Sequence, residues 1–354
     1  MKFKMFLRVF GIIAILLTIF PFIPVDHWFI RVFDFPHLQL TLLTLLALLT
    51  YFYRFNLKNI QDYIFVITLL GCFIFQSIKI YPYTSFAPYE VQSASKNATK
   101  FLTLYTANVL QTNDNFERLL EDINKQEADI LLFTETDQNW INQLTKILDK
   151  SYEYKIQVPK DNTYGMLFFS KFEVLDSKIK YLIEDTIPSI HTKIILPFQD
   201  TIQFFAIHPA PPMPQHNPSS VDRDAEMMKI TKLSRDSPFP VIVLGDFNDV
   251  AWSETTALFQ KVSGLLDPRK GRGFFSTYNA KSWIMRWPLD HIFTSPEFRV
   301  KQVYLGEKFG SDHFPLFTEL SFEPHLAGEQ RLMPPSKEEV DAAFNQIEEV
   351  KDED

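Results

Sequence analysis

The chain has one cysteine among its 354 residues, Cys72, and that residue falls inside a long apolar run. A disulfide framework is therefore excluded as a source of stability. Glycine is also scarce, with 10 residues, and the sequence contains no glycine-rich phosphate loop. Basic residues form no continuous stripe and the formal net charge is −8, which disfavours a protein that holds nucleic acid through many phosphate contacts.

Charged residues are sparse over the first 80 residues, where three apolar runs cover about residues 6–23, 38–53 and 63–80. Each run is close to the roughly 17 to 25 residues that a membrane-spanning helix needs, although the second is short. Three runs in succession without a small-residue cleavage pattern predict three retained transmembrane helices rather than a signal peptide. A buried helical hairpin of a soluble protein is the alternative, but these runs offer no polar face to water.

The basic residues predict the orientation of these helices. Lys2, Lys4 and Arg8 precede the first run, and Arg54 and Lys58 lie between the second and the third. By the positive-inside rule, the N-terminus and the second connection face the cytoplasm. Three crossings of the cell (inner) membrane then place the chain after residue 80 on the extracytoplasmic or periplasmic side.

Three further segments are expected beyond the membrane helices of residues 1–80. Residues 81–100 are rich in Pro, Ser, Ala and Asn and are expected to form a linker that tethers a folded domain to the helices. Residues 101–322 alternate strand-like and helix-like patterns, which predicts a layered α/β domain whose sheets are covered by helices. Residues 323–354 form an acidic tail, in which Ser336 is a candidate N-cap for a short helix.

Polar residues interrupt the predicted strands of this domain where the strands end or begin. The run "VIVLGDFNDV" starts at residue 241 as a buried strand and then presents Asp246, Asn248 and Asp249. The other strand ends carry Asn108, Glu135, His208, Asp290, Asp312 and His313. Each residue alone has an ordinary explanation as a turn former or helix cap. Carboxylates, amides and histidines at six strand ends together predict a metal-assisted hydrolytic site.

Six motifs in this part of the chain resemble one known group of enzymes. They stand in the order "TAN", "FTET", "IHPAPP", "GDFND", "PLDHIF" and "GSDHFP" between about residues 101 and 322. This set resembles the exonuclease-endonuclease-phosphatase superfamily, which includes exonuclease III and deoxyribonuclease I. The resemblance implies a four-layered α/β (α+β) sandwich, in which two mixed β-sheets pack face to face between helices, with the site at one end.

The resemblance also implies a metal ion and its ligands. Glu135 resembles the principal Mg²⁺ ligand, and Asn108 and Asp312 would help to hold the metal or its waters. Mn²⁺ fits the same oxygen ligands. Thr134 stands where many nucleases of the family have Gln before the catalytic Glu, so the outer shell of the metal is expected to differ.

The catalytic roles follow from the same resemblance. Asp246 would orient and deprotonate the attacking water, and Asn248 would contact a phosphate oxygen. His313, held by Asp290, would bind and polarise the phosphate, and His208 would lie near the leaving group. In-line attack on phosphorus requires such a set, because water must be positioned, charge neutralised and the leaving oxygen stabilised.

Three other polar residues near these motifs are expected to take no part in the site. His291 directly follows Asp290 and is expected to point away from it on the next strand. Arg223 and Glu226, on the helix after "IHPAPP", are expected to form a solvated pair, with support of the site as the alternative.

Membrane helices ahead of such a domain resemble a membrane-anchored bacterial branch of the superfamily. An anchor raises the effective concentration of a lipid headgroup and gains little for a soluble nucleotide. We therefore expect a Mg²⁺-dependent phosphoesterase that hydrolyses a phosphate ester or pyrophosphate, with a membrane lipid or lipid-linked phosphate as substrate. A membrane-anchored nuclease that cleaves extracellular DNA or RNA is the alternative, since deoxyribonuclease I is itself acidic. A non-catalytic scaffold is a third hypothesis, against which the intact catalytic set argues.

Overall fold

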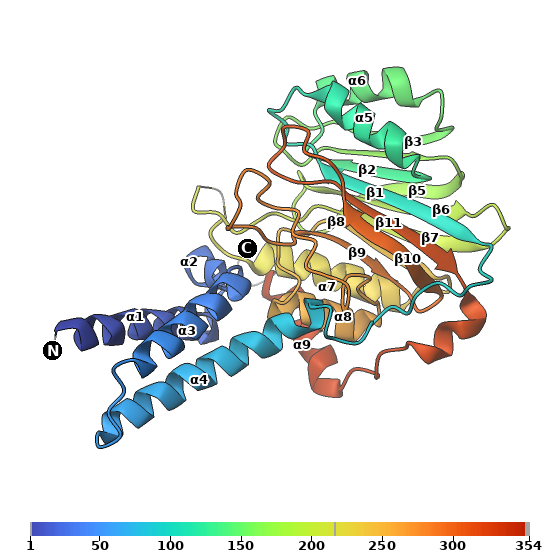
Figure 1. The fold of residues 1–354 in the computed structure, drawn as a ribbon. Coiled ribbons are helices and arrows are strands. Elements are labelled where there is room, and N and C mark those ends of the chain that lie inside the picture. The colour runs from blue at the N-terminus through green and yellow to red at the C-terminus, as the bar shows by residue number, and fades with distance from the viewer. Residues whose placement is uncertain (1, 216, 351–354) are drawn as a thin grey trace.

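The computed structural model describes residues 2–215 and 217–350, which form a helical N-terminal unit and a layered α/β domain (Figure 1). Two β-sheets make up the centre of the domain. The first has the strand order β10 (Phe298–Leu305), β11 (Leu316–Phe322), β1 (Phe101–Asn108), β2 (Ile130–Thr134), β4 (Met166–Ser170) and β3 (Tyr154–Val158). The second has the order β5 (Glu173–Tyr181), β6 (Pro188–Ile195), β7 (Thr201–Ile207), β8 (Val241–Asp246) and β9 (Asp290–Thr294).

Both sheets are mixed, and their strand directions bring the expected site residues to one edge. β1 runs parallel to β2, and β7 runs parallel to β8, whereas β9 is antiparallel to β8 and β11 is antiparallel to β1. The first residue of β9, Asp290, therefore pairs with the last residue of β8, Asp246. Likewise, the start of β11 pairs with the end of β1, through Leu316 and Thr106.

Buried side chains join the sheets and helices into four layers. Leu102 and Leu104 of β1 share one buried cluster with Ile242 and Leu244 of β8, which fills the space between the sheets. A second cluster joins the first sheet to α5 (Phe116–Gln126) and α6 (Gln138–Leu148). A third joins the second sheet to α7 (Val221–Arg235), α8 (Glu254–Ser263) and α9 (Lys337–Glu349). The expected arrangement of two mixed, packed sheets flanked by helices is confirmed.

The acidic tail contributes one of these outer helices. After a short 3₁₀ helix, η4 (Pro324–Glu329), the chain reaches α9, whose first turn is closed by a capping box between Ser336 and Glu339. The predicted cap at Ser336 is thus confirmed. Val340, Ala343 and Ile347 of α9 pack into the cluster that contains α7 and α8.

The N-terminal unit consists of α1 (Lys2–Ile19), α3 (His37–Phe52) and α4 (Ile60–Ile80), which project away from the domain (Figure 1). Lys2–Phe22, which includes the 3₁₀ turn η1 (Phe20–Phe22), and Ile60–Tyr83 are long and apolar enough to cross a membrane. Only 22% and 17% of their apolar windows are buried, so most of this hydrocarbon surface is open.

The second of the three predicted membrane helices is not one continuous span. α3 has 16 residues and is about 24 Å long, which is less than the roughly 30 Å hydrocarbon core of a bilayer. It qualifies as a span only together with α2 (Trp28–Arg31) and η2 (Val32–Asp34), from which it is bent by 71°. The break falls at Pro36, which has no amide hydrogen to donate to a carbonyl oxygen of the preceding turn.

Polar side chains lie inside the helical unit and apolar side chains lie outside it. Gln76 of α4 donates a hydrogen bond to Thr18 of α1 and accepts one from Thr44 of α3, at 3.3 Å. Polar contacts of this kind join helices in apolar surroundings. The outer surface of the unit exposes large aliphatic side chains, including Ile12, Leu16, Leu42, Leu46, Leu49, Ile64 and Ile67.

One ion-pair cluster ties together the end of this unit that lies far from the domain. Asp62, at the start of α4, is buried and forms ion pairs with Lys4 and Arg8 of α1. The N-terminal end of α1 and the connection between α3 and α4 are therefore neighbours, and Figure 1 shows both on the side away from the domain.

Residues 81–100, expected to form a loose tether, are packed against the domain. The chain passes from α4 through the 3₁₀ turn η3 (Tyr81–Tyr83), and the buried Tyr83 hydroxyl donates to the carbonyl oxygen of Ala251 at 2.5 Å. Val91 belongs to the main core, and Glu90 accepts from Lys270 at 2.8 Å. The Pro and Ser content of this segment predicts a tether, but its apolar and aromatic side chains lower the free energy when they are buried, so the segment packs against the domain.

Candidate active site

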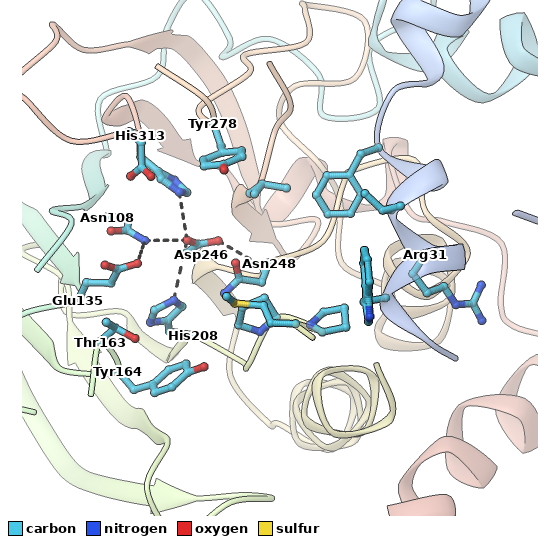
Figure 2. A pocket seen from close by; sticks show the side chains of 18 residues that line it. Arg31, Asn108, Glu135, Thr163, Tyr164, His208, Asp246, Asn248, Tyr278 and His313 are labelled. Carbon is cyan, nitrogen blue, oxygen red and sulfur yellow. Dashed lines mark hydrogen bonds and ion pairs between the residues drawn. The ribbon is translucent and has the colours of Figure 1, made fainter. Parts of the chain in front are cut away.

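Side chains from three strand ends meet at one edge of the sandwich (Figure 2). Asn108, the last residue of β1, donates from Nδ2 to Glu135 Oε1 at 2.8 Å and to Asp246 Oδ2 at 2.9 Å. Glu135 directly follows β2, and Asp246 is the last residue of β8. One amide therefore holds two carboxylates that come from different sheets.

The backbone at these strand ends is strained. Glu135 has a φ of 62° and Asn248 has a φ of 52°, in the left-handed region that is uncommon for residues other than glycine. Such conformations cost energy and cluster at functional sites. Gly245 has a φ of 146°, and a Cβ there would lie 1.9 Å from the carbonyl oxygen of Ile207 on β7. Glycine thus allows the close approach of β7 and β8 just before Asp246.

Asp246 is fully buried among donors. Burial disfavours its charged form, but the imidazoles of His313 and His208 and hydrogen bonds from Asn108 and the Asn248 amide outweigh burial and lower the pKa of Asp246. The Nε2 atoms of His313 and His208 lie 3.6 Å and 3.9 Å from Asp246 Oδ2. Asp246 is therefore a carboxylate at neutral pH and can accept a hydrogen bond from water.

His313 is charged because of the acidic groups around it. Its Nδ1 lies 2.7 Å from Asp290 Oδ2. Burial alone would lower the pKa of His313, but Asp290, Asp246 and Asp312 outweigh burial and raise the pKa to about 10. At neutral pH the ring is an imidazolium, which donates one N–H to Asp290 and turns the other toward Asp246 (Figure 2).

The remaining predicted residues lie beside this cluster. The His208 ring packs against Tyr164 with 5.3 Å between centroids. Asn248 donates from Nδ2 to the carbonyl oxygen of Pro209 at 3.0 Å, and Asp312 lines the same cavity next to His313. The structure thus brings all the predicted site residues together, and their individual roles stay predictions.

His291 points away from the cavity, as expected from its place on β9. Arg269 donates to His291 Nδ1 at 2.7 Å, and Nε2 lies 2.9 Å from the carbonyl oxygen of Asp249. Arginine has no acceptor, so Nδ1 must accept and Nε2–H must donate. Burial lowers the pKa of His291 to about 3, which agrees with this neutral form.

The expectation that Arg223 and Glu226 form a solvated pair is wrong. Both side chains are buried. Arg223 donates to the carbonyl oxygen of Asn248 at 3.1 Å and forms an ion pair with Asp224 at 2.8 Å. Arg223 therefore supports the strained backbone of Asn248 through this hydrogen bond.

The catalytic groups line a cavity of about 540 Å³. Its wall includes Thr163, Tyr164 and Tyr278, which were not predicted from the sequence. The Tyr278 ring lies 5.0 Å from the His313 ring. These residues come from irregular loops, where no periodic pattern marks a position as part of a site.

The same wall includes residues from the helical unit. Trp28, Arg31, Val32 and Phe35, from α2, η2 and the turn after them, line the cavity, and Figure 2 shows Arg31 on the side away from the catalytic cluster. None of these four residues was predicted, because the apolar composition of the N-terminal part indicates an anchor alone. A signal was present, since the connection "PVDHWFIRVFDFP" is apolar and aromatic, unlike a solvated loop.

Two sets of donors in this site have the chemistry to hold a metal ion. Glu135 and Asp312 offer carboxylate oxygen atoms of the kind that Mg²⁺ prefers, whereas Asn108 turns its Nδ2 to Glu135 and accepts from the Leu110 amide with Oδ1. Burial raises the pKa of Glu135, which shows that its charge is not fully compensated by the protein. Asp246, Asp290 and His313 each offer a donor atom within 4.8 Å of the others.

Comparison with known families accounts for this arrangement. The profile of the Endonuclease/Exonuclease/phosphatase family matches residues 105–313, which span the cluster from β1 to His313. The chain belongs to this family. Its members hydrolyse phosphate esters with the help of divalent metal ions. No curated protein sequence matches the chain.

Solved structures show the same family fold at low sequence identity. D. rerio TDP2, complexed with a single strand DNA product, is 16% identical with a TM-score of 0.54, and the match covers 63% of this chain and 100% of that one. An endonuclease/exonuclease/phosphatase from Beutenbergia cavernae is 15% identical with a TM-score of 0.53, over 64% and 72% of the two chains. One from Bacteroides vulgatus is 20% identical with a TM-score of 0.51, over 64% and 100%. These likenesses concern the fold alone.

Proposed function

We propose that this chain is a membrane-anchored, metal-dependent phosphoesterase that hydrolyses a phosphate ester or pyrophosphate of a lipid at the outer face of the membrane. The composition of the cavity wall carries this proposal. The wall combines Asp246 and His313 of the catalytic cluster with Trp28 and Val32 of the apolar helical unit. A cavity with both kinds of wall suits a substrate with both a phosphate and an apolar part.

The catalytic groups are placed for in-line attack on phosphorus. Asp246 accepts a hydrogen bond from the attacking water and orients it. His313 donates from Nε2 to a phosphate oxygen and neutralises the charge that develops there. His208 lies on the other side of Asp246 (Figure 2), where it can pass a proton to the leaving oxygen.

We assign the metal to Glu135, with Asn108 and Asp312 beside it. A cation at this position would compensate the buried carboxylate of Glu135, whose pKa burial raises. A bound Mg²⁺ or Mn²⁺ ion supplies Lewis-acid stabilisation of the phosphate oxygens. The set that contains His313 suits a metal less, because an imidazolium has no free lone pair to offer.

The distribution of basic residues supports an outer location for the domain. Lys4 and Arg8 lie at the far end of the helical unit, together with the connection that carries Arg54 and Lys58. The positive-inside rule assigns that end to the cytoplasm. The domain lies at the opposite end (Figure 1) and would then face the outside.

The test is turnover by the full-length, detergent-solubilised protein, with Mg²⁺ and with a chelator, on polyprenyl pyrophosphate, sphingomyelin and plasmid DNA. We expect chelator-sensitive hydrolysis of a lipid phosphate, and its loss in Asp246→Asn. The matched control is Asp200→Asn, which changes an aspartate on the surface whose one ion pair among the described residues is a weak contact with Lys100, at 2.9 Å. A folded Asp246→Asn protein that keeps its turnover would disprove the assigned chemistry.

A nuclease anchored in the membrane is the second candidate. The observation in its favour is the fold shared with D. rerio TDP2, whose structure holds a single strand DNA product. The net charge of −8 disfavours a nucleic-acid substrate. Nicking of plasmid DNA without any lipid turnover would replace the lipid proposal by this one.

A further inference from the structure

The segment α2–η2 forms a fixed wall of the cavity. The Trp28 amide donates to the carbonyl oxygen of Pro218 at 2.7 Å, and the Ser220 amide donates to that of Asp26 at 3.0 Å. At the other end of the segment, Trp252 donates from Nε1 to the carbonyl oxygen of Asp34 at 2.8 Å. Contacts at both ends hold this segment in place, so it belongs to the site rather than to a mobile lid.

The side of this segment that lines the cavity is apolar. The charge of Arg31 is already engaged by Asp26 and Asp34, and Figure 2 shows its guanidinium turned away from the catalytic cluster. Val32 lines the cavity and is 46% exposed, and Met213 on the facing loop is 43% exposed. Open hydrocarbon surface beside a phosphate-handling cluster costs free energy in water, and an apolar part of a ligand would remove that cost.

The position of the segment in the chain indicates where such a ligand would continue. α2–η2 connects α1 to α3, and both of these helices expose aliphatic side chains on their outer surfaces, such as Ile12 and Leu42. An apolar chain that contacts Val32 therefore lies on the segment that leads to these apolar helix surfaces.

We propose that α2–η2 is a substrate-binding subsite, in which Trp28, Val32 and Phe35 contact the hydrocarbon chain that follows the scissile phosphate. This inference rests on the proposed function and adds to it a specificity element outside the family domain. The subsite selects substrates by their chain, whereas the cluster around Asp246 acts on the phosphate.

The first test compares substrates that share a phosphate group and differ in chain length. The full-length protein is assayed with dimethylallyl, farnesyl and long-chain polyprenyl pyrophosphate, and with sphingomyelin and its short-chain analogue. In Val32→Asn and Trp28→Ala, the ratio of kcat/KM for the long chain to that for the short chain should fall about tenfold, as expected for loss of an apolar contact. Val25→Asn is the matched control, because Val25 is similarly exposed at 41% and lies outside the cavity wall.

The second test reads binding without turnover. In the presence of chelator, a lipid phosphate with a photoreactive group near the head of its chain should label the peptide of residues 28–35. Labelling confined to the outer face of α3, around Leu42 and Leu46, would overturn the subsite. So would an unchanged chain-length ratio in both variants while lipid turnover persists, whereas absence of lipid turnover in the unmodified protein would overturn the proposed function itself.

Discussion

The His313 imidazole and the Asp290 carboxylate form a buried pair, with 2.7 Å between Nδ1 and Oδ2. Asp290 is also paired with Asp246 across β8 and β9, so the same strand contact fixes both carboxylates. We expect Asp290→Asn to lower kcat/KM for a lipid phosphate about 100-fold, because the amide keeps the shape but removes the charge that holds His313 protonated. Steady-state kinetics at neutral pH measure this effect. Turnover within a few-fold of the unmodified protein would show that the pair is only structural.

Metal dependence should follow Glu135. The variant Glu135→Gln removes the carboxylate that we assign to the ion, so the Mg²⁺ concentration for half-maximal activity should rise at least about tenfold. Binding of Mn²⁺, followed by calorimetry, should weaken in parallel and gives a readout that does not depend on activity. Glu117→Gln, on the exposed side of α5, is the control. Equal Mn²⁺ affinity in Glu135→Gln and the control would place the ion elsewhere.

Stability should depend on pH through Glu226. Burial raises the pKa of Glu226 to about 8, above the ordinary value of 4.5, and its Oε1 lacks a hydrogen-bond partner among the described residues. Between these two values the folded state binds a proton that the unfolded state does not. Stability therefore falls as pH rises through this window, by up to about 1.4 kcal/mol per pH unit.

Glu226→Gln should remove this dependence. We expect the unfolding temperature of the variant, relative to that of the unmodified protein, to rise progressively between pH 5 and pH 8, a window set by the two pKa values of Glu226, and to exceed it at the upper end. Thermal unfolding in detergent, followed by circular dichroism, measures both curves. Glu348→Gln, an exposed change on α9, should keep the original slope. Parallel curves for Glu226→Gln and the unmodified protein would contradict the assignment.

The orientation in the membrane can be read with thiol labels. In a Cys72→Ser background, Glu117→Cys in the domain should react with a membrane-impermeant reagent in intact cells. Lys58→Cys, in the connection between α3 and α4, should react only after the cells are opened. Both positions are exposed, so access to solvent within the protein does not separate them. The reverse pattern would place the domain in the cytoplasm.

The residues of the catalytic cluster could be predicted from the sequence because each one stands at the end of a strand pattern. Asn108, Glu135 and Asp246 follow apolar runs, and antiparallel pairing brings Asp290 and His313 to the same edge. Strand patterns are local, and the edge where their ends meet follows from the order and direction of the strands. The strand pattern therefore predicted which side chains would lie at one edge, and their catalytic roles stay predictions.

Other parts of the site depend on contacts between distant segments and left no local pattern. Arg223 has the sequence context of a solvated helical residue, and it is buried against the loop after β8, where it contacts Asn248 and Asp249. Trp28 and Val32 belong to the cavity only because α2–η2 is bent away from α3 and bonded to the loop before α7. Neither arrangement follows from periodicity, since tertiary packing decides it.

The contact between Tyr83 and Ala251 has a geometric consequence. Because α4 runs directly into η3, and the Tyr83 hydroxyl is bonded inside the domain, the domain cannot swing freely on its helices. The contacts of Trp28 and Trp252 fix it at a second point. The reactive cluster is thus held at a constant height above the ends of the apolar helices. Such an enzyme would cleave phosphates close to the bilayer surface and would not reach phosphates carried further out on long headgroups.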